Sequence, residues 1–413
     1  MRARKVIVIG AGPAGMMAAG AAAENGADVI LIEKNSKVGR KLRITGKGRC
    51  NITNYCDNDE FIRHLTSNSR FMYSAINRFS CYDTVAFFND LGLETKVERG
   101  SRVFPASDKA SDVVDAFCRY ITSAGVKIKT AEVKSLIIED GSIKGVRLAD
   151  EELLADCVII ACGGLSYPGT GSTGDGYTFA KAAGHTITPI LPSLVPLVCD
   201  DPACGELQGL ALKNIRISVT DNYSKKEIYT DFGEMLFTHF GVSGPVILSA
   251  GAHMRNMSVE RYTVSIDLKP ALDEETLDKR ILRDFSKFSN KDLSNSLYEL
   301  LPKSLIPVIL RRADIDGHTK CNAVTAVQRN RLLKAIKRFD LLIHGFRPID
   351  EAIVTCGGVD VKEVNPKTME SKLMKGLYFA GEVLDLDAYT GGFNLQIAYS
   401  TGRLAGESAA KMD

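Results

Sequence analysis

The pattern of apolar and polar positions predicts a βαβ unit at the start of the chain. Lys5–Ile9 is a β-branched apolar run that ends at a glycine, and Asp28–Glu33 is a second run of the same kind. Between them, an alanine-rich stretch up to about Asn25 predicts a helix. A strand, a helix and a strand in this order open a doubly wound α/β fold.

Later segments alternate between helical and strand-like patterns. Helical spacing is expected over 59–91, 109–124 and 393–410. Strand-like runs cover 126–136, 143–148, 156–162 and 376–380, with a hairpin turn at Asp140-Gly141. The stretches 194–240 and 261–268 are β-rich, whereas 272–340 is charged and helical in pattern.

These zones predict an α/β domain that is interrupted in sequence by two other parts. We expect the α/β domain over 1–192 and 355–413, a β-rich domain over 193–271 and 340–354, and a helical insertion over 272–339. A chain of 413 residues has room for this, since a domain takes roughly 150 residues.

The first strand runs directly into a glycine-rich turn, GAGPAG at 10–15, and Glu33 ends the next strand. Gly10 permits a tight turn, Gly12 lets a pyrophosphate approach the backbone, and Gly15 lets the helix pack closely on the strands. Glu33 would bind ribose hydroxyls and repel a 2′-phosphate, so FAD or NAD is favoured over NADP. A second match to G-x-G-x-x-G, at 169–174, follows no strand directly, and we interpret it as a loop.

Charge and cysteine content exclude several other classes of protein. The 52 Lys and Arg against 50 Asp and Glu leave no global field for nucleic acid, so a small-molecule substrate is expected, with no nucleic acid partner. The ten cysteines show no zinc spacing, so we expect no metal site and reduced thiols in a cytoplasm. Residues 6–23 are uncharged but broken by glycines and Pro13, so we expect neither a signal peptide nor a membrane span.

Seven basic residues lie over 34–49. One interpretation is a solvated or nucleic-acid-binding patch, and a second is a loop beside a pyrophosphate. No aromatic residue interleaves them, which favours the second interpretation. The string RKLRITGKGRCNITN at 40–54 resembles the corresponding loop of the BaiN/YhiN-type flavoproteins, relatives of aminoacetone oxidase. Further matching segments are 102–105, 166–168, 170–176, 237–239 and 366–370.

This resemblance implies a Rossmann-like FAD-binding domain interrupted by a β-barrel-like domain and a helical domain. It also implies that Glu382 points toward the ribityl chain, and that the helix starting after Gly392 directs its N-terminal dipole at the flavin ring. The turn and the resemblance together give the expected FAD-binding residues: Gly10, Gly12, Pro13, Ala14, Gly15, Glu33, Lys34, Arg40, Lys41, Thr45, Gly46, Gly48, Arg49, Cys50, Asn51, Val133, Gly163, Gly164, Gly381, Glu382, Gly391, Gly392, Asn394, Leu395, Gln396 and Ile397.

Members of this family are associated with reduction of conjugated double bonds in 3-oxo-Δ4 and Δ4,6 bile acid intermediates, which is the leading hypothesis. Hydride from reduced flavin would add to the distal carbon while a donor stabilises the enolate, and the candidate donors are His239, Tyr167 and Tyr389. NADH, or NADPH, would reduce the flavin from a transient site, because the chain has no second Rossmann fingerprint.

Two alternatives remain open at this point. One is a flavin-dependent oxidase of a small amine such as aminoacetone, which would produce hydrogen peroxide. The other is a flavin-carrying RNA-binding or redox-sensing protein, favoured by the basic loop and by Arg329, Arg331, Lys334, Lys337 and Arg338 but opposed by the near-neutral charge. We do not expect an active disulfide between Cys50 and Cys56, because five residues separate them, and we place Cys157 and Cys162 in the core.

Overall fold

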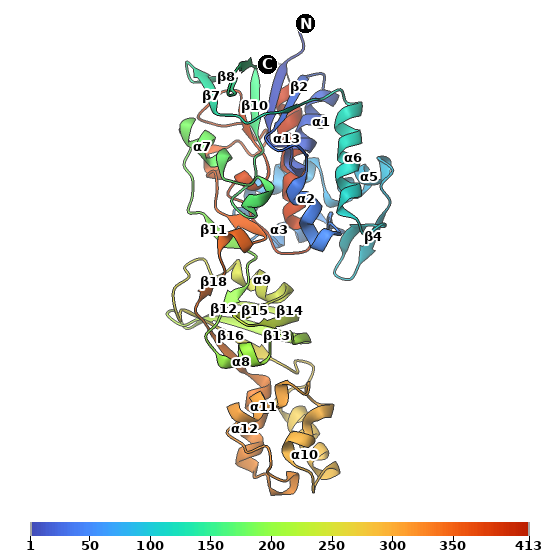
Figure 1. Cartoon of the computed structure of the whole chain (residues 1–413), viewed down its shortest axis with the longest axis vertical. Helices are drawn as coiled ribbons and strands as arrows, with labels where there is room; N and C mark the ends of the chain where they lie inside the picture. Colours follow the sequence, from blue (N-terminus) through green and yellow to red (C-terminus); the bar gives the residue numbers. More distant parts are fainter. Residues whose placement is uncertain (1, 412–413) are drawn as a thin grey trace. The chain divides into compact units, whose positions relative to one another are not determined.

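The computed structural model describes residues 2–411 and divides the chain into two compact units (Figure 1). The first unit consists of Met1–Ser193 and Pro348–Asp413, and the second of Leu194–Arg347. The fold is the expected α/β fold with a Rossmann-like sheet.

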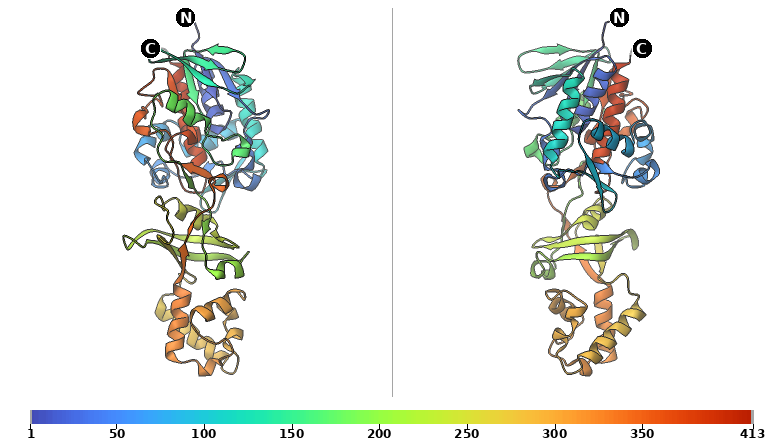
Figure 2. Two further views of the ribbon diagram at one scale, coloured as in Figure 1. Left: turned by 60° about the vertical axis from the view of Figure 1, so that its left-hand side comes forward. Right: turned by 90° about the vertical axis from the view of Figure 1, so that its right-hand side faces the viewer.

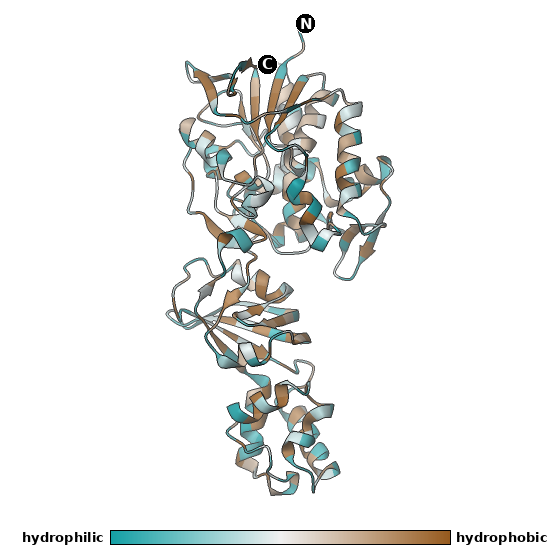
Figure 3. Cartoon of the chain, viewed as in Figure 1, coloured by the Kyte–Doolittle hydropathy of each residue, from teal (hydrophilic) through white to brown (hydrophobic). Residues whose placement is uncertain are grey.

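A five-stranded parallel sheet forms the centre of the first unit. Its strands, in spatial order, are β20 (Leu377–Phe379), β10 (Cys157–Ile160), β1 (Lys5–Ile9), β2 (Asp28–Glu33) and β6 (Lys127–Thr130). Val6, Ile7 and Val8 are at most 1% exposed, as expected for a strand that is covered on both faces. Figure 3 shows these strands mostly in brown, the colour of apolar residues.

The first helix, α1 (Pro13–Glu24), packs against the last helix, α13 (Phe393–Ala410), as Figure 1 and Figure 2 show. The two backbones approach so closely that a Cβ at Gly402 would overlap the carbonyl oxygen of Ala14, and one at Gly406 would overlap that of Ala18. The glycines and alanines of both helices therefore serve this contact, which brings the two ends of the sequence together.

The remaining elements of the first unit surround this centre. Its other helices are α2 (Arg40–Ile44), α3 (Asn58–Arg63), α4 (Tyr73–Arg78), α5 (Cys81–Asp90), α6 (Ala110–Ser123) and α7 (Asp175–Ala182). Its smaller sheets contain β3 (Thr53–Asn54), β4 (Thr95–Glu98) and β5 (Arg102–Pro105), then β7 (Ser135–Glu139), β8 (Ser142–Arg147) and β9 (Glu152–Leu154), and finally β11 (Leu191–Ser193) and β19 (Val354–Cys356).

One strand prediction in this unit is wrong. The apolar run over 126–136 is two strands, β6 and β7, because the chain leaves the parallel sheet at Ala131 and enters an antiparallel sheet at Ser135. The predicted hairpin turn between β7 and β8 is confirmed: Asp140 and Gly141 have φ of 48° and 70°, the left-handed values of a tight two-residue turn.

The second unit is built on a seven-stranded antiparallel sheet. In spatial order its strands are β17 (Phe339–Ile343), β16 (Tyr262–Asp267), β13 (Ala211–Asp221), β14 (Lys226–Thr238), β15 (Gly241–Ser243), β12 (Leu197–Val198) and β18 (Gly345–Phe346). The helices are α8 (Pro202–Glu206), α9 (Pro245–Gly251), α10 (Glu274–Lys287), α11 (Leu305–Arg312) and α12 (Ala326–Lys337). Leucines of the helical segment and residues of the sheet belong to one buried apolar cluster, so the two parts share a core. Among residues 2–411, no helix combines the length and the hydrophobicity that a membrane crossing requires.

Candidate functional site

The turn between β1 and α1 depends on two glycines for its shape. Gly10 has φ of 98°, its N–H donates to Ile32 O at 2.8 Å, and an added Cβ would lie 2.7 Å from Ala161 O. A Cβ at Gly15 would overlap the carbonyl oxygen of Gly10. Larger residues at either position would therefore push α1 away from the sheet.

Gly12 is different, because a Cβ there would have no heavy atom within 4 Å. It is the N-cap of α1, where no side chain caps the helix and the first turn carries no acidic residue. The first N–H groups of a helix have no partner within the helix, and its positive dipole end favours an anion. Open space and free N–H groups at this point fit a pyrophosphate.

Glu33 lies at the end of β2, beside this turn. Its Oε2 accepts from Ala11 N at 2.9 Å, and its Oε1 accepts from the N and Nδ2 atoms of Asn35 at 2.9 and 2.7 Å. A carboxylate can accept about four hydrogen bonds, so capacity remains for a ribose hydroxyl. Val133 follows β6, whose Thr130 is the register partner of Glu33.

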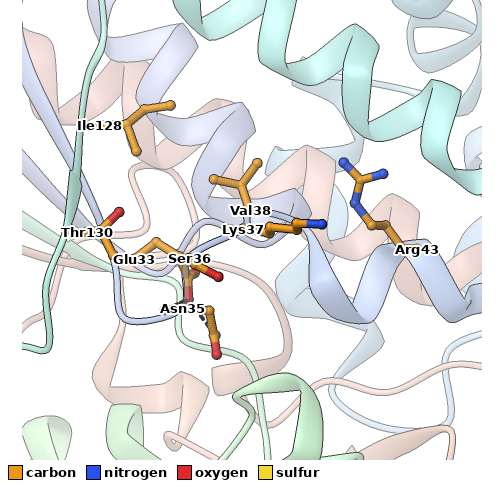
Figure 4. A pocket seen from close by; sticks show the side chains of 8 residues that line it. All are labelled: Glu33, Asn35, Ser36, Lys37, Val38, Arg43, Ile128 and Thr130. Atoms are coloured by element: carbon orange, nitrogen blue, oxygen red, sulfur yellow. Dashed lines mark hydrogen bonds between the residues drawn. The ribbon is translucent and has the colours of Figure 1, made fainter.

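A cavity of about 480 Å³ opens next to Glu33 (Figure 4). It is lined by Glu33, Asn35, Ser36, Lys37, Val38, Arg43, Ile128 and Thr130. This cavity lies at the carboxyl end of β2, the edge at which doubly wound sheets bind their ligands.

Several cations of the 34–49 loop are already paired with acids and amides of the same unit. Lys34 Nζ lies 2.5 Å from Asp175 Oδ2, and Arg40 Nη1 donates to Asn35 Oδ1 at 2.6 Å. These bonds brace the loop and reduce its capacity to bind a polyanion.

Arg49, expected among the FAD-binding residues, points its guanidinium group elsewhere. It contacts Glu98 at 2.6 Å and Asp108 at 2.5 Å and lies over the ring of Phe104. The hydrogen bond from Arg49 lowers the pKa of the Glu98 carboxyl, and those from Lys96 and then Arg49 lower the pKa of Asp108. The side chain of Arg49 thus has a structural role, because it joins two acids that are distant from it in sequence.

The backbone at the end of this loop adopts left-handed conformations, and its last residue, Cys50, is buried. Gly46, Gly48 and Cys50 have φ of 56°, 83° and 59°, and Thr45 Oγ1 donates to Leu42 O at 2.7 Å. Burial raises the pKa of the Cys50 thiol to about 12, so this thiol stays protonated at neutral pH. Cys50 therefore shapes the loop and is not a nucleophile.

Asn51 carries an observation that points to a ligand. Its Oδ1 is buried and has no hydrogen-bond partner within the described residues 2–411. A buried polar atom without a partner costs roughly 1–3 kcal/mol, so such atoms usually mark an absent ligand or water. Together with the open space at Gly12, Asn51 indicates that the residues present fit a dinucleotide cofactor.

A four-residue polar cluster joins the two halves of the first unit. Lys41 Nζ contacts Glu382 Oε2 at 2.8 Å and donates to Ser166 Oγ at 2.6 Å. Glu382 Oε1 also accepts from Ser166 Oγ at 3.1 Å and from Thr355 N at 2.9 Å. Gly163, with φ of 75°, and Gly164 precede Ser166, and a Cβ at Gly164 would overlap Thr355.

Ser166 and Thr355 were missed as site residues by sequence reasoning. Positions 41, 166, 355 and 382 are far apart in the chain, and a single serine or threonine carries no local signal. Only the pairing of β10 with β20 and of β11 with β19 brings them to one place. Gly381, with φ of 77°, lies just before Glu382 and against Ala14 of α1.

The start of α13 is held by residues of β3. Gly391 and Gly392 have φ of 120° and 98°, Asn54 Nδ2 donates to Gly391 O at 3.2 Å, and a Cβ at Gly392 would overlap Thr53. Close approach to β3 therefore requires a glycine at 392. The N-terminus of α13 has no side-chain cap, as at α1.

Asn394 and Gln396, both expected to bind FAD, use their side chains within the protein. Asn394 Nδ2 donates to Ala388 O at 2.8 Å and its Oδ1 accepts from Ala388 N at 3.0 Å. Gln396 is fully buried: Oε1 accepts from Thr53 and Thr84, and Nε2 donates to Phe79 O and Ser400 Oγ. The Gln396 N–H also donates to Gly392 O, so this residue holds α13 in place rather than facing a ligand. Leu395 is half-buried and Ile397 is 2% exposed, as parts of the same helix.

The three candidate proton donors do not lie in one unit. Tyr167 has φ of 53° and is 36% exposed, just before the short helix Pro168–Thr170. The Tyr389 ring lies edge-to-face on His64, which stacks on Phe393 with 4.3 Å between centroids. His239 belongs to the second unit, where it is exposed. His64 is a neighbour of Tyr389 that the sequence did not indicate.

Basic residues of the second unit are mostly neutralised by ion pairs. The pairs are Arg329–Asp278 at 2.7 Å, Arg331–Asp314 at 2.7 Å, Lys337–Asp267 at 2.5 Å and Arg338–Asp340 at 3.0 Å. These pairs weaken the argument that this segment attracts RNA by its charge. No group of three or more His, Cys, Asp or Glu with metal-binding geometry occurs within 2–411.

The parallel sheet, the glycine turn and the polar cluster define a Rossmann-type flavin-dependent oxidoreductase. The chain belongs to the HI0933-like family, whose model, described as "HI0933-like protein Rossmann domain", matches residues 4–408. This confirms the BaiN/YhiN-type resemblance, and the chain is accordingly an FAD-dependent oxidoreductase.

Three relatives match at least 96% of the chain. The 3-dehydro-bile acid delta(4,6)-reductase of Clostridium scindens is 33% identical, over 98% of this chain and 99% of its own. The ribosomal RNA dihydrouridine synthase of Escherichia coli is 32% identical, over 96% of this chain and 95% of its own. Among solved structures, the 3-ketosteroid delta1-dehydrogenase of Sterolibacterium denitrificans has a TM-score of 0.52 at 12% identity, covering 98% of this chain and 99% of that one, which supports the fold.

Proposed function

We propose that this protein reduces carbon–carbon double bonds that are conjugated to a carbonyl group, with 3-oxo-Δ4 and Δ4,6 bile acid intermediates as substrates. The observation that carries the proposal is the similarity to a 3-dehydro-bile acid reductase over 98% of the chain. That similarity includes the cofactor turn, the polar cluster around Glu382 and the whole second unit.

The second relative points to the same class of reaction. Dihydrouridine is uridine whose ring double bond, conjugated to a carbonyl, has been reduced. The names of both relatives therefore describe saturation of a polarised double bond, although one substrate is a steroid acid and the other a nucleotide in ribosomal RNA. Both names support the same reaction class, whereas the steroid substrate is supported by one relative and the ribosomal RNA substrate by two.

Different residues of the first unit would bind different parts of FAD. Gly12 and the start of α1 would bind the pyrophosphate, Glu33 the ribose, and Lys41 and Glu382 the ribityl side of the site. When bound and reduced, FAD would supply the hydride that adds to the carbon distal to the carbonyl group. The N-terminus of α13 would stabilise negative charge near Gly392 through its dipole and free N–H groups.

The protein must also stabilise the enolate oxygen and deliver one proton to the neighbouring carbon. Tyr167 and Tyr389 in the first unit and His239 in the second are the candidates for the hydrogen-bond donor. NADH or NADPH would reduce the cofactor from a transient site. The fingerprint that directly follows a strand, GAGPAG at 10–15, would already hold FAD, and the second glycine match at 169–174 follows no strand directly.

Reduction of a uridine in ribosomal RNA is the second candidate function. It is favoured by two relatives of that name, at 32% and 30% identity over 96% of this chain. The ion pairs of the 329–338 segment and the net charge of +2 argue for the small-molecule substrate.

The test is an anaerobic reaction of the FAD-loaded protein with NADH, followed by a 3-oxo-Δ4 bile acid. We expect the flavin absorbance to bleach with NADH and to return with the steroid, giving a product that carries two additional hydrogen atoms. Return with unmodified ribosomal RNA but not with the steroid would favour the second candidate. Bleaching by aminoacetone, and return in air only, with hydrogen peroxide released, would overturn both in favour of an amine oxidase.

A further inference from the structure

Two cysteines that are distant in sequence meet in the first unit. The Sγ atoms of Cys56 and Cys81 lie 3.9 Å apart, although the residues are 25 positions apart. Cys56 follows β3 and is 8% exposed, whereas Cys81 is the first residue of α5 and is fully covered. The structure therefore pairs Cys56 with Cys81 and not with Cys50.

The two thiols differ in their electrostatic surroundings. Either thiol can be the donor in the contact between the two sulfur atoms. Hydrogen bonding with Cys56, followed by that with Thr53, lowers the pKa of Cys81. Cys81 also lies in the first turn of a ten-residue helix, whose N-terminus favours a thiolate. The contact with Cys81, together with burial, raises the pKa of Cys56. The pair thus places a thiol of lowered pKa in contact with one of raised pKa.

The segments that carry the two thiols also meet at the protein surface. Tyr55 and Tyr82, the sequence neighbours of the two cysteines, pack edge-to-face with 4.9 Å between ring centroids. Their exposed fractions are 47% and 45%. Two surface tyrosines are therefore the sequence neighbours of the two buried thiols.

The same segments support the start of α13. Thr53 of β3 and Thr84 of α5 both donate to Gln396 Oε1, at 2.6 and 2.8 Å. Gly392, the N-cap of α13, packs directly on Thr53. Any shift between β3 and α5 is therefore transmitted to the end of the helix that the flavin ring would face.

We propose that Cys56 and Cys81 form a reversible disulfide that hydrogen peroxide generates and that weakens FAD binding. The Cys81 thiolate attacks peroxide, takes one oxygen to become a sulfenic acid, and releases hydroxide. The Cys56 sulfur then attacks the Cys81 sulfur and expels its hydroxyl, which leaves as water with the proton lost by Cys56. The hydroxide released in the first step takes up the proton that Cys81 lost on ionising, which gives the second water. In sum, two thiols and one peroxide give one disulfide and two waters.

Formation of the bond changes the local geometry. A disulfide requires about 2 Å between the sulfur atoms, so the present 3.9 Å must shorten. The shift draws the residues after β3 toward α5 and disturbs the shared bonds of Thr53 and Thr84 to Gln396. The predicted effect of the disulfide on FAD binding rests on the proposed FAD site, whereas formation of the disulfide does not.

The experiment treats the FAD-loaded, full-length protein with hydrogen peroxide, blocks the remaining thiols and maps the peptides. A Cys204→Ser background removes the other contacting pair, Cys199 and Cys204. We expect two fewer alkylated thiols, a linked peptide containing Cys56 and Cys81, and recovery with dithiothreitol. FAD should dissociate at least about threefold faster from the oxidised protein.

Cys118→Ser is the matched control, since Cys118 is a partly exposed thiol on α6. It should behave like the parent, whereas Cys56→Ser and Cys81→Ser should each abolish the linked peptide. Either variant suffices if the other does not fold. Absence of the linked peptide, or sulfinic acid at a single cysteine, overturns the disulfide. A disulfide without faster FAD loss overturns the coupling alone and leaves the FAD site unaffected.

Discussion

Two segments of this protein match the same glycine pattern but have opposite surroundings. The first, at 10–15, leads from β1 into α1, and the second, at 169–174, leads from a short 3-10 turn into α7. The first leaves open space at Gly12 and has no acid in the following helical turn. The second places Asp175 in the first turn of α7, where it pairs with Lys34 at 2.5 Å.

The difference shows that a glycine spacing becomes an anion site only where a buried strand directs it. In the first segment, the backbone of Ala161, which follows β10, leaves no room for a side chain at Gly10, and the carbonyl of Gly10 leaves none at Gly15. The second segment packs instead on Asn35, whose Nδ2 donates to Thr170 O at 3.4 Å and lies where a Cβ of Gly171 would be. It therefore braces Asn35, which in turn donates to Glu33.

The largest expected effect is a difference in the free energy of unfolding between a glycine substitution in the first segment and one in the second. In Gly15→Ala the Cβ would overlap the Gly10 carbonyl oxygen, so α1 must move, at a cost of about 3 kcal/mol in the free energy of unfolding. In Gly169→Ala the Cβ enters open space, and the change should stay within about 0.5 kcal/mol. Denaturant unfolding of both proteins measures the contrast; equal losses would contradict it.

A second change tests binding separately from folding. Gly12→Ala adds a Cβ in the open space at the start of α1, so the FAD-free protein should lose no more than about 1 kcal/mol of stability. FAD affinity should fall at least about tenfold, because the methyl group occupies the expected place of the pyrophosphate. Fluorescence titration with FAD measures this, with Gly169→Ala as the control. Unchanged affinity would place the pyrophosphate elsewhere.

A third pair of variants compares the acids next to the two segments. Glu33→Gln removes a charged acceptor from Ala11 N and from the expected ribose, so FAD affinity should fall about threefold to tenfold. Asp175→Asn weakens the pair with Lys34, an ion pair that is more than a quarter exposed, and the hydrogen bond from Thr173, and affinity should change less than about twofold. The same titration distinguishes them, and an equal loss would remove the distinction between the two acids.

The smallest effect concerns two buried thiols near the segments. Burial raises the pKa of Cys162, which follows β10, to about 12, and that of Cys50 to the same value. A free cysteine of pKa near 8.5 is half ionised at pH 8.5, whereas these two should be below about 0.1% thiolate there. Iodoacetamide should therefore label them only slowly, with rates rising about tenfold per pH unit. Fast labelling at pH 8 in the folded protein would show that the pKa values are not raised.

Sequence reasoning succeeded where the signal is local. The β1–α1–β2 unit, the glycine turn, the hairpin at Asp140 and the family were all predictable, because each depends on neighbouring residues or on a long contiguous string. It failed over 126–136, where the apolar pattern continues through a change of sheet. Hydrophobic periodicity reports which residues are buried but not which sheet they join.

Long-range competition for hydrogen bonds explains the remaining differences. Arg49, Asn394 and Gln396 are among the expected FAD-binding residues, and their side chains bind Glu98, Ala388 and Thr53 within the protein. Ser166 and Thr355 join Glu382 although nothing in their own segments indicates it.

The sequence by itself determined the class of protein and the segment that would bind the pyrophosphate, because a strand, three glycines and an acid at fixed spacing have one compatible backbone geometry. Tertiary structure alone decided which polar groups remain unpartnered. Within residues 2–411, it left Asn51 Oδ1 without a hydrogen-bond partner. It also paired the guanidinium group of Arg49 with Glu98 and brought Cys56 next to Cys81. The physical reason is that a polar side chain binds the partner that folding brings within about 3 Å, and that distance depends on every packed element between them.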